Sequence, residues 1–228
     1  LRRSRPGPAQ LVTFDSHTDT MLPFLRWGFR AAQASGQREP DSRDYIPRRV
    51  ERVDFANEES IREAAKDLWH DEHIQAAQET GIVGDAFIVT FGSPPNSPDQ
   101  RSQRLHYLNG ICHYGCHKIP HDESCRIRSA DLAIDDQHLV PLFQSNPVAA
   151  GLLEGRTPLI LDIDLDYFLT EQAFRPYKHT LLSSLAQKPD TITIATEPMY
   201  VEDCRIDDTI TWEASLAKVF NILGATGK

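Results

Sequence analysis

Four short apolar runs divide the chain, and each of them is typical of a buried strand. They are rich in β-branched or aromatic residues and end at polar or turn-forming residues, as interior strands commonly do. The runs are residues 10–14, 86–91, 158–165 and 191–196. Because they contain few polar interruptions, we predict a sheet that is covered on both faces.

Between these runs, apolar residues recur at helical spacing. Residues 57–80 open with acids, stop at Gly81 and predict one long amphipathic helix. The polar segment 36–49 contains prolines and predicts a loop. Shorter helices are predicted at residues 21–34, 179–187 and 208–223.

Strands that alternate with helices predict an α/β protein, a three-layer αβα sandwich with a mainly parallel central sheet. A chain of 228 residues is long enough for one sizeable core, so we expect a single domain over residues 1–228. Residues 93–157 follow no clear pattern and predict an irregular insertion.

Composition and charge narrow the classes of function. The chain is 40% hydrophobic and 25% charged, which is ordinary for a globular protein. No apolar run approaches the roughly 20 residues of a membrane helix, and residues 1–10 lack the apolar part of a signal peptide, so we expect a cytoplasmic protein. The net charge of −9 argues against a nucleic-acid partner. One basic segment, residues 43–52, is interrupted by acids and is interpreted as a solvated loop rather than a phosphate site.

Cysteine usage gives no disulfide framework, because four cysteines are few for a chain of this size. Three of them lie with three histidines in CHYGCHKIPHDESC, residues 112–125. Such density is typical of structural zinc, but the spacing matches no established zinc pattern. We interpret the segment as a reduced, partly buried loop and keep zinc as the alternative.

Two acidic motifs lie at the ends of predicted apolar strands. FDSHTD follows the first strand, and LDIDLDYF lies at the end of the third. Side chains at every second position of a strand point to one side, and the carboxyl ends of parallel strands are where α/β sheets bind ligands. Several carboxylates in one crevice repel one another unless protons or a cation neutralise them. Aspartates also end strands or cap turns without binding any ligand. Two such motifs, each after an apolar strand, nevertheless favour a metal site. Carboxylates together with one imidazole indicate manganese, magnesium or iron. The two sets are Asp15, His17 and Asp19, and Asp162, Asp164 and Asp166.

The motif DSHTD at 15–19 resembles the D-x-H-x-D metal motif of the arginase-type ureohydrolases, and DIDLD at 162–166 resembles their D-x-D motif. Together with HIQAAQETGIV before AFIVTF, and TITIAT, these segments are most similar to the ureohydrolase-like branch that includes peptide arginases. The resemblance implies an arginase-like and deacetylase-like fold, two Mn²⁺ ions, and conversion of arginine side chains in a peptide to ornithine with release of urea. A small guanidino compound is the other substrate that it implies.

The resemblance also implies roles for individual residues. Asp15 and Asp162 would bridge the two manganese ions. Asp19 would complete one ion and hold the bridging hydroxide through a hydrogen bond. His17 and Asp164 would complete the other ion. Apart from the resemblance, we expect Asp166 to lie behind the ligands and to orient a ligand or a loop.

Other positions follow the family less closely. Glu197 occupies the place of the glutamate that grips the guanidinium in arginases, although a loop acid is the alternative reading. Glu72 lies where relatives carry a polar residue on the substrate side, and His70 and His73 are candidate proton shuttles. Arginases have a further metal-binding histidine upstream, but no histidine precedes His17 here. The first ion would then be weakly held, or its ligand would lie before residue 1.

Three functions remain open at this point. The first is manganese-dependent hydrolysis of a guanidinium group, which is a linear amidine. The nucleophile would be a hydroxide formed from bound water, whose pKa the two cations lower. The negative charge of the chain would attract such a cationic substrate. The second is a metal-dependent amide hydrolase of the deacetylase kind, against which the sequence Asp166-Tyr167-Phe168 argues. The third is a non-catalytic binding protein on the same fold.

Overall fold

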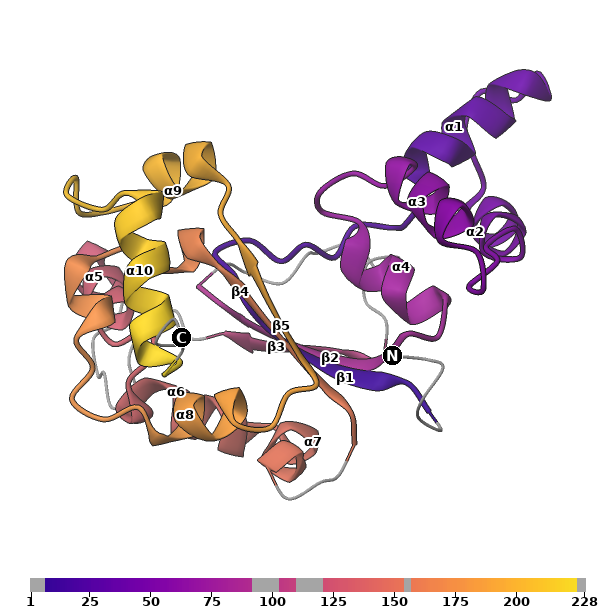
Figure 1. Cartoon of the computed structure of the whole chain (residues 1–228). Helices are drawn as coiled ribbons and strands as arrows, with labels where there is room; N and C mark the ends of the chain where they lie inside the picture. The colour runs from indigo at the N-terminus through magenta and orange to yellow at the C-terminus, as the bar shows by residue number, and fades with distance from the viewer. Residues whose placement is uncertain (1–6, 92–102, 110–120, 154–156, 225–228) are drawn as a thin grey trace. The chain divides into compact units, whose positions relative to one another are not determined.

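The computed structural model describes residues 7–91, 103–109, 121–153 and 157–224 (Figure 1). By its internal contacts the chain divides into two compact units. The described part of the first comprises residues 7–8, 19–85 and 103–104. The second comprises residues 9–18, 86–91, 105–109, 121–153 and 157–224. Our expectation of a single domain stays a prediction, and each unit is treated on its own below.

A five-stranded sheet in the order β3-β2-β1-β4-β5 organises the second unit. The strands run parallel, which confirms the predicted α/β class and parallel sheet. In the register of the sheet, Thr13 of β1 lies opposite Asp162 of β4, and Asp162 lies opposite Thr193 of β5. The strands are β1 (Ala9–Phe14), β2 (Val83–Thr90), β3 (Leu105–Asn109), β4 (Leu159–Asp164) and β5 (Thr191–Ala195).

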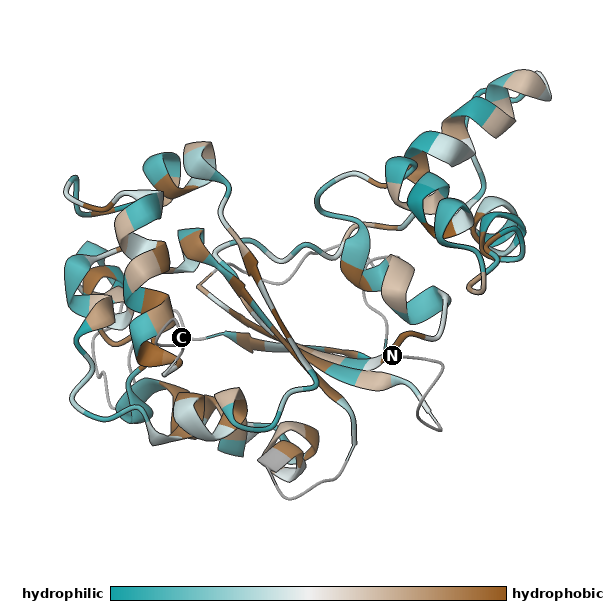
Figure 2. Ribbon diagram, in the orientation of Figure 1, coloured by the Kyte–Doolittle hydropathy of each residue, from teal (hydrophilic) through white to brown (hydrophobic). Residues whose placement is uncertain are grey.

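The four predicted strands are present within a few residues of their expected bounds. Their apolar side chains form the core: Val12, Phe87 and Leu161 are completely buried. Figure 2 shows the hydrophobic colouring that runs along the central strands. The exception is β5, an edge strand whose residues are all partly or fully exposed, because it has a neighbour on one side only.

Helices of the second unit pack around the sheet. Helix α6 contacts α8 and β3, whereas α9 and α10 contact the short 3-10 helix η3 that follows β4. The predicted helices at 179–187 and 208–223 are confirmed as α8 and α10. The helices are α5 (Glu123–Asp131), α6 (Asp136–Ser145), α7 (Pro147–Ala150), α8 (Thr180–Ala186), α9 (Pro198–Cys204) and α10 (Trp212–Ile222), with 3-10 helices η2 (Gly151–Leu153), η3 (Leu165–Tyr167) and η4 (Glu171–Phe174).

The segment 93–157, expected to be irregular, is regular over much of its described part. It supplies the edge strand β3 and the helices α5, α6 and α7. Local capping explains the helices: the side chain of Asp122 accepts from the backbone of Cys125, and that of Asp135 accepts from Gln137 at 2.9 Å. These aspartates satisfy first-turn amides that have no partner within the helix.

The described part of the first unit contains four helices, and here two predictions were wrong. They are α1 (Leu25–Ala34), α2 (Ser42–Val50), α3 (Glu58–Lys66) and α4 (His73–Glu79). The segment 36–49, predicted to be loop, contains most of α2, which Asp41 caps by accepting from the amide of Arg43. The single helix predicted at 57–80 is broken into α3 and α4, because Asp67 ends α3 and its carboxylate pairs with Arg30 and Arg49.

Close helix packing holds this unit together. Gly28 of α1 lies against the ring of Tyr45 in α2, where a Cβ would come within 2.8 Å of the ring carbons. Phe24, which precedes α1, is buried with a left-handed backbone, and Arg49 lies over its ring. Among the described residues of both units, no helix is long and apolar enough to cross a membrane.

Candidate metal centre

The first half of the candidate centre lies directly after β1. Asp15 is buried, and its backbone amide donates to Val89 of the neighbouring strand at 3.1 Å. Its carboxylate oxygen Oδ1 accepts from the amide of His17 at 2.7 Å, so the chain turns sharply here. The hydroxyl of Thr90 donates to the carbonyl of Ser16 at 3.1 Å. These bonds fix both sides of the turn against β2.

The second half lies where β4 ends. Asp164, the last residue of β4, is buried, and its side chain accepts from the amide of Asp166 at 3.2 Å. The chain therefore leaves the extended conformation and enters η3 before it reaches Asp166. The next residue, Tyr167, is completely buried and donates to the carbonyl of Ala133 at 2.9 Å. The burial of this ring holds η3, and with it Asp166, in place.

Asp166 joins the two halves. Only 1% of it is exposed, and its Oδ1 accepts from the amide of Ser16 at 3.1 Å. Its Oδ2 lies 2.8 Å from Nδ1 of His17. The burial of Asp166 raises its pKa, although the Ser16 amide and His17 each lower it. A proton or a cation is therefore favoured at this carboxylate.

Three buried carboxylates come together as a result. One oxygen each from Asp15, Asp164 and Asp166 lie within 4.8 Å of one another. At that separation three negative charges are strongly unfavourable in a partly buried environment. The arrangement suits a cation that takes oxygen ligands.

A second group of metal-ligand type shares one member with the first. It consists of His17, Asp166 and Cys204, again with one ligand atom each within 4.8 Å. Cys204 is the last residue of α9, and its sulfur lies 3.9 Å from Oδ2 of Asp166. Burial and the charge of Asp166 raise the pKa of this thiol. Cys204 was not predicted as a candidate, because nothing in the sequence around it indicates which strand end α9 returns to.

Asp162, which the resemblance placed as a bridging ligand, has other neighbours. Its carboxylate accepts from the hydroxyl of Thr13 at 3.0 Å and from that of Thr193, on the two adjacent strands. The groups of metal-ligand type in the described part of the chain include Asp164 and Asp166 but not Asp162. A shift of the D-x-D motif by two residues, to Asp164-Leu165-Asp166, fits this geometry.

Glu197, expected to contact a guanidinium, lies directly before α9. Its side chain does not cap that helix, and the residue is partly buried. On the same helix, the ring of Tyr200 meets that of His17 edge to face, with 5.5 Å between centroids. Helix α9 therefore brings Cys204 and Tyr200 to His17, while the role of Glu197 stays a prediction.

The remaining candidates belong to the first unit. Asp19 has a left-handed backbone, and its Oδ2 lies 3.7 Å from Nδ1 of His73. The same ring nitrogen of His73 lies 2.8 Å from the carbonyl of His70. Because Asp19 and Asp15 belong to different units, the expected sharing of a metal between them stays a prediction.

Glu72 is fully buried in the first unit. Its Oε2 accepts from the amide of Leu25 at 3.3 Å, while no partner among the described residues meets its Oε1. Burial raises the pKa of Glu72, and burial together with the charge of Glu72 raises that of Tyr45 to about 12. The substrate-side role expected for Glu72 stays a prediction.

The cysteine and histidine segment 112–125 is covered only in part. Cys112, His113, Cys116 and His117 lie outside the described residues. Cys125 is buried in α5. The choice between a reduced loop and a zinc site therefore stays open.

Comparison with known proteins identifies no family. No protein-family model matches the chain, and no curated protein matches it. The relation to arginase-type enzymes thus remains a resemblance of motifs.

Proposed function

We propose that this chain is a metal-dependent hydrolase of guanidinium groups, with arginine side chains of a peptide as substrate and urea as a product. One observation carries the proposal: the buried carboxylates of Asp15, Asp164 and Asp166 converge after two neighbouring parallel strands. Carboxyl ends of parallel strands are the usual ligand-binding edge of an α/β sheet. An arginase-like three-layer arrangement and a cytoplasmic location belong to the same proposal.

The donor atoms fit a pair of divalent ions. Asp15, Asp164 and Asp166 would hold one ion, and His17, Cys204 and the shared Asp166 would hold the other. Carboxylate oxygens favour manganese, magnesium or iron, whereas a thiolate with an imidazole favours zinc or iron at the second position. When bound, such ions supply a hydroxide nucleophile near neutral pH and stabilise the charge that develops during hydrolysis.

The residues of the chain itself supply orientation and charge. The 2.8 Å contact between Oδ2 of Asp166 and Nδ1 of His17 fixes the imidazole ring beside the carboxylate that the two proposed ions would share. The side chain of His17 is 49% exposed, so the group that it holds can be reached from solvent. A net charge of −9 favours a cationic substrate, and Glu197 before α9 is the carboxylate that would pair with its guanidinium.

Urea release tests the proposal. The protein is loaded with Mn²⁺ or Fe²⁺ and given free arginine, agmatine or an arginine-containing peptide. We expect urea from the peptide, and none from Asp164→Asn, which removes one buried carboxylate. Asp208→Asn is the matched control, because Asp208 is an exposed acid of the same unit. Metal that binds without urea release from any of the three substrates would overturn the proposal.

The sulfur of Cys204 favours a second candidate, a metal-dependent amide hydrolase. A set of sulfur, nitrogen and oxygen ligands suits zinc, which also activates water for amide hydrolysis. With Zn²⁺ bound, this enzyme would release acetate from an acetylated lysine peptide and no urea from arginine. Release of urea alone would exclude it.

A further inference from the structure

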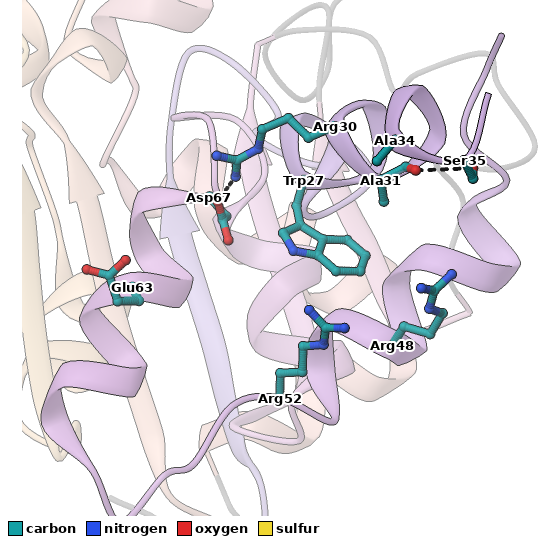
Figure 3. A pocket seen from close by; sticks show the side chains of 9 residues that line it. All are labelled: Trp27, Arg30, Ala31, Ala34, Ser35, Arg48, Arg52, Glu63 and Asp67. Atoms are coloured by element: carbon teal, nitrogen blue, oxygen red, sulfur yellow. Dashed lines mark hydrogen bonds and ion pairs between the residues drawn. The ribbon is translucent and has the colours of Figure 1, made fainter. Parts of the chain in front are cut away.

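A pocket of about 630 Å³ lies within the first unit, and none of its lining residues belongs to the candidate metal centre. It is formed by α1, by α2 and the residues that follow it, and by α3 with the residue that ends it. Figure 3 shows Trp27 among the residues that line it, with Arg30, Arg48 and Arg52 around the indole ring. A volume of this size is in the range of small-molecule sites.

The charges of the pocket do not cancel. Its two acidic residues are already paired: Asp67 with both Arg30 and Arg49, and Glu63 with Lys66 at 2.5 Å. Pairing with Lys66 lowers the pKa of Glu63, although both side chains of this pair are more than half exposed. With three arginines and two acids, the lining carries a net positive charge.

Two arginines remain for a ligand. The guanidinium of Arg48 pairs with Asp44 at 3.0 Å, but this contact is on the surface and both side chains are more than half exposed. Surface pairs of this kind contribute little and are exchanged easily. The guanidinium of Arg52 lies over the ring of Trp27, 5.3 Å from its centroid, and no carboxylate in the described part of the chain pairs with it. In a protein of net charge −9, this is a local excess of positive charge beside an aromatic ring.

Besides the charged residues and Trp27, the lining consists of Ala31, Ala34 and Ser35, the residue that ends α1. Ala31 and Ala34 of α1 add methyl groups to the face that Trp27 provides. When a guanidinium lies over an indole ring, its N–H groups stay available, because they point outward in the plane of the guanidinium itself. There they can bind two oxygens of a phosphate or carboxylate group at once. The pocket thus combines a forked anion donor with an apolar surface.

We propose that this pocket binds a small organic anion, whose phosphate or carboxylate group contacts Arg52 and Arg48 and whose apolar body lies against Trp27. A long polyanion such as nucleic acid is disfavoured by the overall negative charge. The inference is independent of the proposed hydrolase, because it uses no residue of the metal centre. The segment 43–52, which we interpreted as a solvated loop, lies mostly in α2 and supplies Arg48 and Arg52 to this pocket.

Calorimetric titration with phenyl phosphate, benzoate, inorganic phosphate and benzyl alcohol tests the inference. We expect phenyl phosphate or benzoate to bind, with affinity that falls as salt rises, and benzyl alcohol not to bind. Whichever of the two aromatic anions binds tighter tells whether the natural ligand carries phosphate or carboxylate. Inorganic phosphate should bind more weakly than phenyl phosphate, because it has no apolar body.

Variants locate the binding. Arg52→Gln should weaken phenyl phosphate by about tenfold, the value of one charge-assisted hydrogen bond. Arg62→Gln is the matched control, since Arg62 is an exposed arginine of α3 that pairs with Glu58 and Glu59 and does not line the pocket. Trp27→Leu should weaken phenyl phosphate more than inorganic phosphate, with folding checked by circular dichroism. Equal losses in Arg52→Gln and Arg62→Gln, or no binding of any anion, would overturn the inference.

Discussion

The substitution Asp166→Asn distinguishes two effects of the carboxylate cluster on the free energy of unfolding. One is the repulsion among the carboxylates, and the other is the stabilisation gained when they bind a metal. Asp166 belongs to both groups of metal-ligand type, so this single change affects every ion that the second unit is proposed to hold. Asparagine has the same shape, and its carbonyl oxygen can still accept from the amide of Ser16, as Oδ1 does at 3.1 Å. The change therefore removes a charge and leaves the turn intact.

The structure sets the expected size of the effect. Two unit charges 4.8 Å apart, the upper limit of separation in the cluster, repel by roughly 3.5 kcal/mol at an effective dielectric constant of about 20. Asp166→Asn removes its repulsion with Asp15 and with Asp164, and it changes the 2.8 Å contact with Nδ1 of His17, whose side chain is half exposed. Without metal, the variant should therefore be at least as stable as the parent at neutral pH.

In the presence of metal, the parent protein should be more stable than Asp166→Asn. An ion at a concentration about a hundredfold above its dissociation constant stabilises the parent by roughly 2.7 kcal/mol, and the variant should lose most of this gain. Thermal unfolding followed by circular dichroism, with chelator and then with Mn²⁺ or Zn²⁺, measures both quantities.

Asp162→Asn provides the comparison. It should destabilise the protein with or without metal, because it weakens hydrogen bonds from Thr13 and Thr193, and it should keep the gain in stability on metal binding. A gain on metal binding that survives in Asp166→Asn but disappears in Asp162→Asn would refute the reasoning and restore Asp162 as the bridging ligand.

Three further substitutions test the packing and the charges of the two units. Gly28→Ala should destabilise the protein by about 1–3 kcal/mol in urea unfolding, because the new Cβ meets the buried ring of Tyr45 at 2.8 Å, whereas Gly151→Ala, where nothing lies within 4 Å, should be nearly neutral. Asp135→Ala should cost about 3 kcal/mol by the same measurement, because its carboxylate accepts from three backbone amides, at 2.9, 2.7 and 3.2 Å; a loss below 1 kcal/mol would contradict this. Burial raises the pKa of Glu72, so its contribution to stability is complete below the ordinary value of about 4.3 and is lost as pH rises through the raised value. Glu72→Gln should therefore stabilise the protein at neutral pH and flatten this dependence in chemical unfolding at several pH values, and an unchanged pH profile would show that Glu72 is not the group responsible.

Local patterns predicted the sheet well and the helices less well. A buried strand needs only a short apolar run, so residues 10–14 and 86–91 were recognisable without their neighbours. The helix predicted at 57–80 failed because its break depends on Asp67, whose carboxylate binds arginines of two other helices. Helix α2 was missed because its Asp41 cap offsets the proline inside it.

The candidate metal centre shows the same limit of local patterns in more detail. The motifs predicted that aspartates from the ends of β1 and β4 converge, and the second unit brings Asp15, Asp164 and Asp166 together. They did not indicate that Asp164 and Asp166 are grouped with Asp15 while Asp162 bonds to threonines. That grouping depends on β4 ending at Asp164 and on the buried ring of Tyr167, which follows Asp166.

The α/β class, the parallel strands and the two acidic motifs at their ends were predictable from the amino-acid sequence, since each follows from the spacing of neighbouring residues. The hydrogen bonds of Asp162 to threonines of adjacent strands, and the position of Cys204 beside Asp166, depend on long-range packing. So does the placement of arginines of α1 and of the segment after α2 around Trp27. These arrangements join residues far apart in the chain, and they depend on how strands pair and helices pack rather than on any local pattern.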